Sequence, residues 1–296
     1  MDYYKNCRLC PRNCSINRYE NAGYCGCRSE IRAARAGLHL FEEPYISGKE
    51  GSGAVFISGC SMKCVFCQNI EISSKCSGID ISIEKIAKIF LRLQTEKKAN
   101  NINIVTGTHF TPSIAEAIRT ARKNGLSIPV IWNSSCYEKV ETLKLLEGLV
   151  DIWLPDLKTL DPNESRMYYN APDYPDMAKE ALDYMVSVSR LSFKENMMKS
   201  GVNVRHLVMP GRIRDSKNVL KYLHTAYGSK IIVSLMNQYT PVRELDFKEL
   251  NRKVTRREYE KAVDYAIELG VENCMIQEGE TASESFIPVF DGSGLE

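Results

Sequence analysis

Three cysteines, Cys60, Cys64 and Cys67, share one short loop with the spacing C-x3-C-x2-C. Three thiolates at this spacing can each bind one iron of a cubane cluster, and the fourth iron is then left without a protein ligand. The alternatives are a zinc site or buried thiols, but a three-cysteine zinc site needs a nearby fourth ligand, which this loop lacks. The spacing therefore favours an iron–sulfur cluster with one iron open to another molecule.

A second group of cysteines lies nearer the amino terminus, at Cys7, Cys10, Cys14, Cys25 and Cys27. Four thiolates in so short a stretch suffice for a closed tetrahedral zinc site or for a second four-iron cluster. We expect Cys7, Cys10, Cys14 and Cys25 to be the ligands, with Cys27 as the competing fourth. A second cluster could relay electrons or bind substrate, whereas zinc would pin the segment to the rest of the fold. Zinc or another structural role is favoured.

The composition excludes several classes of partner. The chain has 296 residues, and its 39 lysines and arginines balance 37 acidic residues, which gives no electrostatic argument for nucleic acid or an anionic membrane. No stretch reaches the roughly eighteen apolar residues of a membrane span, and the first ten residues contain no apolar signal region. Eight of the eleven cysteines precede Ser73, a clustering that favours metal ligation over disulfides. We therefore expect a cytoplasmic protein with no nucleic-acid or membrane partner.

Short β-branched runs alternate with amphipathic stretches from residue 54 onward, which is typical of β–α units around a parallel sheet. Strands are predicted at residues 54–58, 102–106, 129–132, 151–154, 202–208 and 230–235. Helices are predicted at residues 83–95, 112–123, 138–147, 176–198 and 216–226, with another near 255–269. Ligands of such sheets gather at the carboxyl ends of the strands, so we expect the chemistry in the loops that follow them.

The expected fold class is α/β, a partial (β/α)6 TIM-like barrel with a Cys-rich N-terminal metal-binding extension. The extension is predicted at residues 1–50, because cysteines and turn-prone polar residues fill it and glycines mark its end. The barrel is predicted at residues 51–245. Residues 246–296 are predicted to form a C-terminal helix and tail that pack on the barrel.

The cysteine loop resembles that of the radical S-adenosylmethionine (SAM) superfamily, in which an aromatic residue, here Phe66, precedes the last cysteine of C-x3-C-x2-C. The resemblance implies a [4Fe–4S] cluster on Cys60, Cys64 and Cys67 whose open iron chelates SAM. It also implies that reductive cleavage of SAM gives a 5′-deoxyadenosyl radical that takes hydrogen from the substrate. Phe66 and Asn69 of the same loop are then candidate cofactor contacts.

More specifically, the chain is similar to the pyruvate formate-lyase activating enzymes, and above all to an uncharacterised group of activating-enzyme-like iron–sulfur proteins. The opening Cys-Arg-Leu-Cys-Pro-Arg-Asn-Cys at residues 7–14 resembles that group. Asp156 and Lys158 match an Asp-Leu-Lys element that helps to hold the SAM carboxylate. Residues 205–211 resemble a Val-Pro-Gly turn near the nucleoside, or are an ordinary strand-ending turn. Gln238 stands where the activating enzymes place a histidine near the ribose.

The chain departs from these enzymes after the second predicted strand, where residues 106–109 read Thr-Gly-Thr-His instead of beginning Gly-Gly-Glu. Carbonyl groups at Thr106 and Gly107 can still accept hydrogen bonds from the SAM amino group. His109 could donate a proton or contact the substrate, or it could be structural. After the third strand, Asn133 is a candidate contact for SAM or a cation. Cys136 could support radical chemistry there, but a lone cysteine is more often a core residue.

The resemblance implies a radical SAM oxidoreductase that activates a partner protein, for example by forming a glycyl radical, with flavodoxin or ferredoxin as electron donor. Two alternatives remain open. The first is a radical SAM enzyme with a small-molecule substrate, and the second is a non-catalytic iron–sulfur or zinc protein. Substrate contacts in such barrels come from loop ends that have no short motif, so the sequence does not name the substrate.

Overall fold

A computed structural model describes residues 2–277 and 288–296, and one ten-stranded sheet forms its centre. The strand order is β10-β9-β8-β6-β5-β4-β2-β1-β3, and neighbours from β2 to β10 run parallel. These parallel strands are β2 (Ser52–Ile57), β4 (Ile102–Val105), β5 (Val130–Ser134), β6 (Ile152–Pro155), β8 (Met197–Leu207), β9 (Ile232–Met236) and β10 (Cys274–Ile276). Antiparallel pairs add β1 (Ile31–His39) and β3 (Ile79–Ile81) at one edge, and β7 (Ser192–Lys194) pairs with β8.

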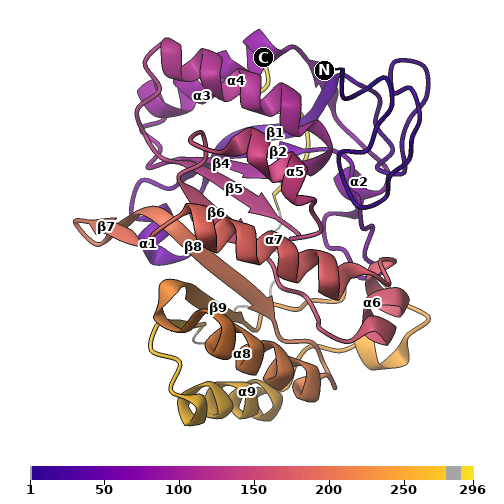
Figure 1. Ribbon diagram of the computed structural model, residues 1–296, viewed down its shortest axis with the longest axis vertical. Coiled ribbons are helices and arrows are strands. Elements are labelled where there is room, and N and C mark those ends of the chain that lie inside the picture. Colours follow the sequence, from indigo (N-terminus) through magenta and orange to yellow (C-terminus); the bar gives the residue numbers. More distant parts are fainter. Residues whose placement is uncertain (1, 278–287) are drawn as a thin grey trace.

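Helices that follow the parallel strands cover the outside of the sheet (Figure 1). Their capping residues explain where several of them begin. Ser82 accepts the N–H of Lys85 at the start of α3, and Thr255 and Glu258 form a capping box at the start of α9. The longer helices are α3 (Ile83–Thr95), α4 (Thr111–Lys123), α6 (Pro162–Tyr169), α7 (Tyr174–Val188), α8 (Ile213–Tyr227) and α9 (Arg256–Leu269). The short ones are α1 (Pro44–Ser47), α2 (Ile70–Ser73) and α5 (Val140–Leu143), with 3-10 turns η1 (Thr108–Phe110), η2 (Lys144–Leu146), η3 (Gly228–Lys230) and η4 (Lys248–Leu250).

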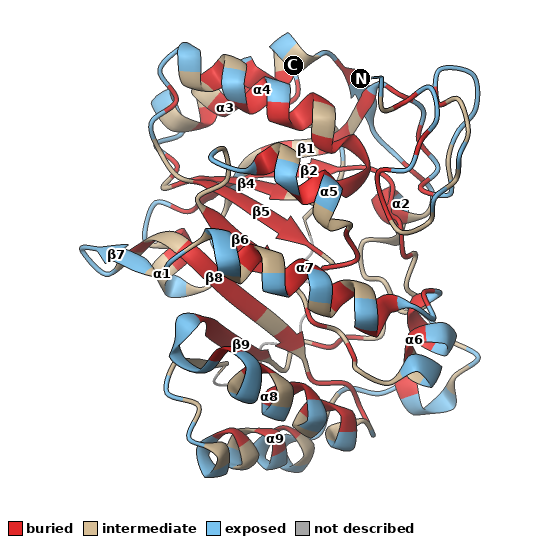
Figure 2. Ribbon diagram, viewed as in Figure 1, coloured by how far each residue is buried: buried red, intermediate tan, exposed pale blue. Residues whose placement is uncertain are grey.

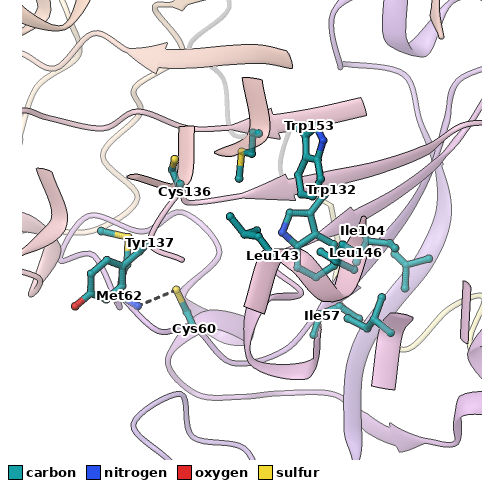
Figure 3. Close-up of a cluster of buried hydrophobic side chains, with 14 of the residues drawn as sticks. Ile57, Cys60, Met62, Ile104, Trp132, Cys136, Tyr137, Leu143, Leu146 and Trp153 are labelled. Carbon is teal, nitrogen blue, oxygen red and sulfur yellow. Dashed lines mark hydrogen bonds between the residues drawn. The ribbon is translucent and has the colours of Figure 1, made fainter. Parts of the chain in front are cut away.

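Alternate side chains of the strands pack on opposite faces of the sheet. Trp132 and Trp153 point into the core beneath the helices, which Figure 3 shows in close-up, and Figure 2 shows that the helices turn their buried sides toward the sheet. On the other face, Ile131 and Ile152 belong to a separate cluster with Ile46 of α1. The short helix α1 therefore fills part of the inner, concave side of the sheet.

The predicted fold class is confirmed, because the chain has a largely parallel α/β sheet of the partial TIM-like barrel type behind a Cys-rich N-terminus. The six predicted strands correspond to β2, β4, β5, β6, β8 and β9. In the described part of the chain, no helix is long and apolar enough to span a membrane.

The helix predicted at residues 176–198 is wrong in its second half, because α7 ends at Val188 and a β7–β8 hairpin follows. The hairpin turn contains Glu195 and Asn196, which have φ angles of 54° and 63°. Two consecutive left-handed residues are typical of the tight turn that joins antiparallel strands. The helix predicted at residues 138–147 is shorter than expected, since only α5 and the turn η2 form there.

The proposed division at residues 50 and 245 stays a prediction. β1 lies within residues 1–50 and pairs along its length with β2, so part of the predicted extension belongs to the central sheet. The predicted C-terminal part includes residues 278–287, which lie outside the described residues.

Candidate functional site

A cavity of about 490 Å³ lies at the carboxyl ends of the parallel strands. Side chains from the loops after β2, β4, β5 and β6 line it, together with residues of β8 and β9 and of the segment between β1 and α1. The lining includes Cys60, Cys64, Cys67, Gln68, Asn69, Thr106, Asn133, Asp156, Lys158, Arg205 and Gln238, with His39, Glu42 and Glu43.

The cysteine loop leaves the fully buried strand β2 through Gly59, whose φ of 90° lies in the left-handed region that favours glycine. A Cβ atom at this position would also lie 2.6 Å from Sγ of Cys27, so no larger residue fits. The loop then presents the three thiols to the cavity. Sγ of Cys60 accepts the N–H of Met62 at 3.3 Å, drawn as a dashed line in Figure 3, and Sγ of Cys67 accepts the hydroxyl of Ser73 at 3.3 Å.

The three thiols of the loop are not drawn together as a single zinc ion would draw them. Within the described chain, only Cys25, Cys27 and His109 bring three candidate ligand atoms to within 4.8 Å of one another, so Cys60, Cys64 and Cys67 are more widely spread. A single zinc ion would hold thiolates about 3.8 Å apart, given tetrahedral bonds of about 2.3 Å. Burial raises the pKa of the Cys60 and Cys64 thiols, so a metal is needed to keep them as thiolates.

A network of charges lines the cavity wall. Lys158 donates from Nζ to Oδ2 of Asp156 at 2.9 Å, and Arg205 donates from Nε to Oδ1 of Asp156 at 2.9 Å. Arg205 also donates to Oε2 of Glu42 at 3.0 Å and to Oδ1 of Asn133 at 2.6 Å. Burial alone would raise the pKa of Asp156, but Lys158 and Arg205 hold it below its usual range. The carboxylate is therefore ionised and fixes both cations.

Lys158 keeps its positive charge although its side chain is largely buried. Burial alone would lower its pKa, but the carboxylate of Asp156 raises it above the usual value. Tyr174 fixes the backbone of this loop, since its hydroxyl donates to the carbonyl of Asp156 at 2.6 Å and accepts the N–H of Lys158 at 2.9 Å. A fixed cation beside three thiols can bind the carboxylate of a ligand.

Six of the eight predicted cofactor contacts line the cavity: Asn69, Thr106, Asn133, Asp156, Lys158 and Gln238. Thr106 has a φ of 64°, a left-handed conformation that costs a non-glycine residue roughly 1 kcal/mol. The resemblance noted above places a glycine of Gly-Gly-Glu at this point of the chain, and Thr106 adopts the backbone conformation that glycine favours.

The other two predicted contacts, Phe66 and Gly107, are not among the described residues that line the cavity. The ring of Phe66 lies edge-on to Tyr169 and Tyr239, with centroids 5.3 and 5.6 Å away. Gly107 packs under Trp132, and a Cβ atom there would lie 2.7 Å from the indole ring. Both residues therefore support the loops around the cavity by packing.

The two catalytic candidates also lie away from the described lining. His109 is buried behind Gly59, and its Nε2 lies 2.8 Å from the carbonyl oxygen of Ser58. Cys136 is fully buried and donates from Sγ to the carbonyl of Ala178 in α7 at 3.5 Å. Neither side chain is among the described residues that line this cavity, so we favour the structural alternative for both.

Sequence reasoning missed Arg205, Glu42 and Glu43. Arg205 lies inside β8, where a charged residue in an apolar strand is the signal that could have revealed it. Glu42 and Glu43 precede the first predicted strand, and the pair of acids before Pro44 carries no recognisable spacing. Glu43 nevertheless places a buried Oε2 atom at the cavity with no hydrogen-bond partner in the described chain, and burial raises the pKa of its carboxyl group.

The amino-terminal cysteines lie beside the cysteine loop, and Figure 1 shows this segment in indigo next to α2. Arg12 donates from Nε to the carbonyl of Ser61 at 2.6 Å, and Cys60 donates its backbone N–H to the carbonyl of Cys25 at 3.3 Å. The predicted extension and the predicted cluster loop are therefore in direct contact.

Comparisons with known proteins identify the family of this chain. The sequence profile of the radical SAM superfamily matches residues 54–223. The uncharacterized protein MJ0674 of Methanocaldococcus jannaschii is 30% identical over 273 residues, which cover 89% of this chain and 75% of that protein.

Two solved structures are similar in fold. SuiB of Streptococcus suis, bound to its precursor peptide SuiA, has a TM-score of 0.54 at 15% identity, and the match covers 75% of this chain. A radical SAM methyltransferase of Sphaerobacter thermophilus has a TM-score of 0.53 at 10% identity, over 81% of this chain and 69% of that one. The chain spans about half of SuiB, 47% of its length.

The family's cofactors, a [4Fe–4S] cluster and SAM, are those that the cysteine loop predicts. By its sequence profile and its relative in M. jannaschii, this chain belongs to the radical SAM superfamily.

Proposed function

We propose that this chain is a radical SAM oxidoreductase in which Cys60, Cys64 and Cys67 hold the [4Fe–4S] cluster and the adjoining cavity binds SAM and the substrate. The observation that carries the proposal is that the three thiols and the charged pair of Asp156 and Lys158 line one cavity. When bound, the cluster supplies one electron for the reductive cleavage of SAM, which gives methionine and a radical that removes hydrogen from the substrate.

Residues at the ends of β4, β5 and β6 offer the groups that would bind SAM. Lys158 offers its ammonium group to the carboxylate of SAM, because Asp156 holds that group charged and in place. Asn133 and the carbonyl of Thr106 offer polar contacts from the neighbouring strand ends. Hydrogen bonds between the Tyr174 hydroxyl and the backbone of Asp156 and Lys158 fix the loop after β6, so Lys158 is positioned before the ligand binds.

Lys158, Asp156, Arg205 and Glu42 are paired with one another at the cavity wall. Arg205 donates to Asp156, Glu42 and Asn133, and its side chain is 13% exposed. Removal of one partner from such a network leaves another charge uncompensated. Arg205 therefore acts as a positioning residue that ties the strand ends β5, β6 and β8 to the segment before α1.

The substrate class we propose is a segment of a partner protein, with flavodoxin or ferredoxin as the electron donor. SuiB, which has a similar fold, is seen with a bound precursor peptide, and the activating-enzyme resemblance points to a protein substrate as well. A small molecule is the second candidate, because Glu43 places a buried Oε2 atom without a hydrogen-bond partner in the described chain at the cavity, where it can bind a hydrogen-bond-donating ligand.

Deuterium transfer separates these substrate classes. Cells of the source organism are grown in heavy water, and their extract is divided into protein and small-molecule fractions that are added to reduced holoenzyme with unlabelled SAM. Under the first proposal, 5′-deoxyadenosine acquires deuterium only with the protein fraction. Deuterium acquired only with the small-molecule fraction contradicts the protein substrate and supports the second candidate. No 5′-deoxyadenosine with either fraction contradicts the oxidoreductase proposal as a whole.

A further inference from the structure

Cys25 lies between the thiols of Cys7, Cys10 and Cys14 on one side and that of Cys27 on the other. The electrostatic neighbours of Cys10 are Cys25, Cys7 and Cys14. Sγ of Cys25 and Sγ of Cys14 lie 3.5 and 3.7 Å from one point, the Cβ position of Gly23.

Cys27 lies on the other side of Cys25: its Sγ is within 4.8 Å of Sγ of Cys25, and it also donates to the carbonyl of Ser58 at 3.3 Å and interacts with Cys76. The fourth thiol beside Cys7, Cys10 and Cys14 is therefore that of Cys25.

Among the described residues, the four thiols of Cys7, Cys10, Cys14 and Cys25 are not drawn together as a single zinc ion would draw them. The set that converges to within 4.8 Å among the described residues is Cys25, Cys27 and His109, so no three of the four thiols approach one another that closely. A tetrahedral zinc site would draw them to about 3.8 Å. In a four-iron cluster each thiolate binds a different iron, so the sulfur atoms stand farther apart, as Cys60, Cys64 and Cys67 also do.

Arg18 is a second observation that points to a negatively charged group at this place. Its side chain is fully buried. In the described chain its guanidinium donates to the carbonyl oxygens of Cys27, Arg28 and His109, at 3.3, 2.5 and 2.5 Å, and to Sγ of Cys7 at 3.8 Å. None of these acceptors is a carboxylate, and a buried cation needs a compensating anion. A cluster with four thiolate ligands is such an anion.

We propose that Cys7, Cys10, Cys14 and Cys25 bind a second [4Fe–4S] cluster, with Arg18 as its compensating cation. This proposal differs from the zinc site favoured by the sequence. The carbonyl of Cys25 accepts the N–H of Cys60 at 3.3 Å, so one hydrogen bond joins a ligand of the second cluster to the loop of the first. All four irons of the second cluster have cysteine ligands, so it does not bind SAM. The proposal does not depend on the reaction proposed above.

Metal analysis of anaerobically purified protein tests the proposal. The wild-type protein is expected to contain about eight iron and eight sulfide per chain, and a Cys60→Ala, Cys64→Ala, Cys67→Ala variant to keep about four of each. A Cys10→Ser, Cys14→Ser variant is expected to lose the other four. Cys274→Ser, which changes a cysteine outside both groups, is the matched control and keeps all eight. One zinc and about four iron in the wild-type protein would overturn the proposal.

Electron paramagnetic resonance supplies a readout besides metal content. The reduced triple-alanine variant is expected to give the signal of a reduced four-iron cluster, and SAM should leave this signal unchanged because no iron is open. A triple-alanine variant that folds, by circular dichroism, but contains no iron would contradict the proposal. So would iron that remains in the Cys10→Ser, Cys14→Ser variant and is lost only on Cys27→Ser, since the metal would then lie with Cys27 and His109.

Discussion

Lys158 donates a hydrogen bond of 2.9 Å from Nζ to Oδ2 of Asp156, and both side chains line the cavity that the three cysteine thiols share. Arg205 donates to the other oxygen of the same carboxylate at 2.9 Å, so Asp156 is fixed in position and stays ionised. Asp156 in turn holds the ammonium group of Lys158 in place. A ligand carboxylate that enters the cavity therefore meets an ammonium group that needs no rearrangement to bind it.

Lys158→Met should weaken SAM binding to the reconstituted protein by about 10- to 100-fold, the cost of one charge-assisted contact. Isothermal titration under anaerobic conditions measures the change, with iron content as a check that the cluster is intact. Lys75→Met is the matched control, because Lys75 is exposed and pairs with Glu71 at 2.6 Å. Equal affinity in Lys158→Met and the control would show that Lys158 does not contact SAM.

Glu138→Leu should lower the free energy of unfolding by about 3 kcal/mol or more, because three buried donors lose their acceptor. The carboxylate of Glu138 accepts from Thr108 Oγ1 at 2.9 Å, Trp132 Nε1 at 2.8 Å and Ser134 Oγ at 2.5 Å. These bonds join the loops after β4 and β5. Anaerobic thermal unfolding gives the measurement, and the exposed Glu116→Leu should change the Tm little. An unchanged Tm in Glu138→Leu would contradict this reading of the network.

The stability of the protein should fall below pH 6.5 because of His39. Burial, helped by Arg205 and Arg35, lowers the pKa of His39 from 6.5 to about 4. The unfolded chain therefore takes up a proton between these values while the folded chain does not, and stability is lost as the pH falls. By linkage the loss at pH 5.5 is about 1.4 kcal/mol.

His39→Phe removes the titrating group and keeps a ring beside Phe41 and Phe56. The Tm of the variant should therefore fall less between pH 7.5 and 5.5 than the Tm of the wild-type protein. Anaerobic thermal unfolding of both holoproteins measures the two decreases. If the two proteins lose the same amount, the pKa of His39 is not lowered in the folded state.

Much of the fold could be predicted because buried parallel strands are short β-branched runs, and because amphipathic helices have apolar residues at helical spacing. The helix predicted at residues 83–95 coincides with α3, where a Ser82 cap and an apolar face coincide. The β7–β8 hairpin was missed because its turn, at Glu195 and Asn196, contains no glycine. β1 was missed because its alternating arginines and alanines resemble neither a buried strand nor a clear hairpin.

The site could be predicted where a residue directly follows a parallel strand, since strand ends converge on one edge. Asn133 came from that rule, whereas Asp156 and Lys158 came from the resemblance to an Asp-Leu-Lys element that follows a strand, and all three line the cavity. Glu42 and Glu43 were missed because they reach the cavity from a segment whose path depends on how α1 packs inside the sheet. His109 follows a strand as well, but η1 turns its ring behind Gly59. The direction of that turn depends on tertiary packing, which no local pattern records.

The most direct test of the account is the formation of 5′-deoxyadenosine by anaerobically reconstituted, dithionite-reduced protein supplied with SAM. Mass spectrometry should detect 5′-deoxyadenosine and methionine with the wild-type protein and with Cys136→Ala, whose thiol lies outside the cavity lining. Cys64→Ala should form neither product. A wild-type protein that holds its clusters and forms no 5′-deoxyadenosine, or a Cys64→Ala variant that forms as much as the wild type, would contradict the account.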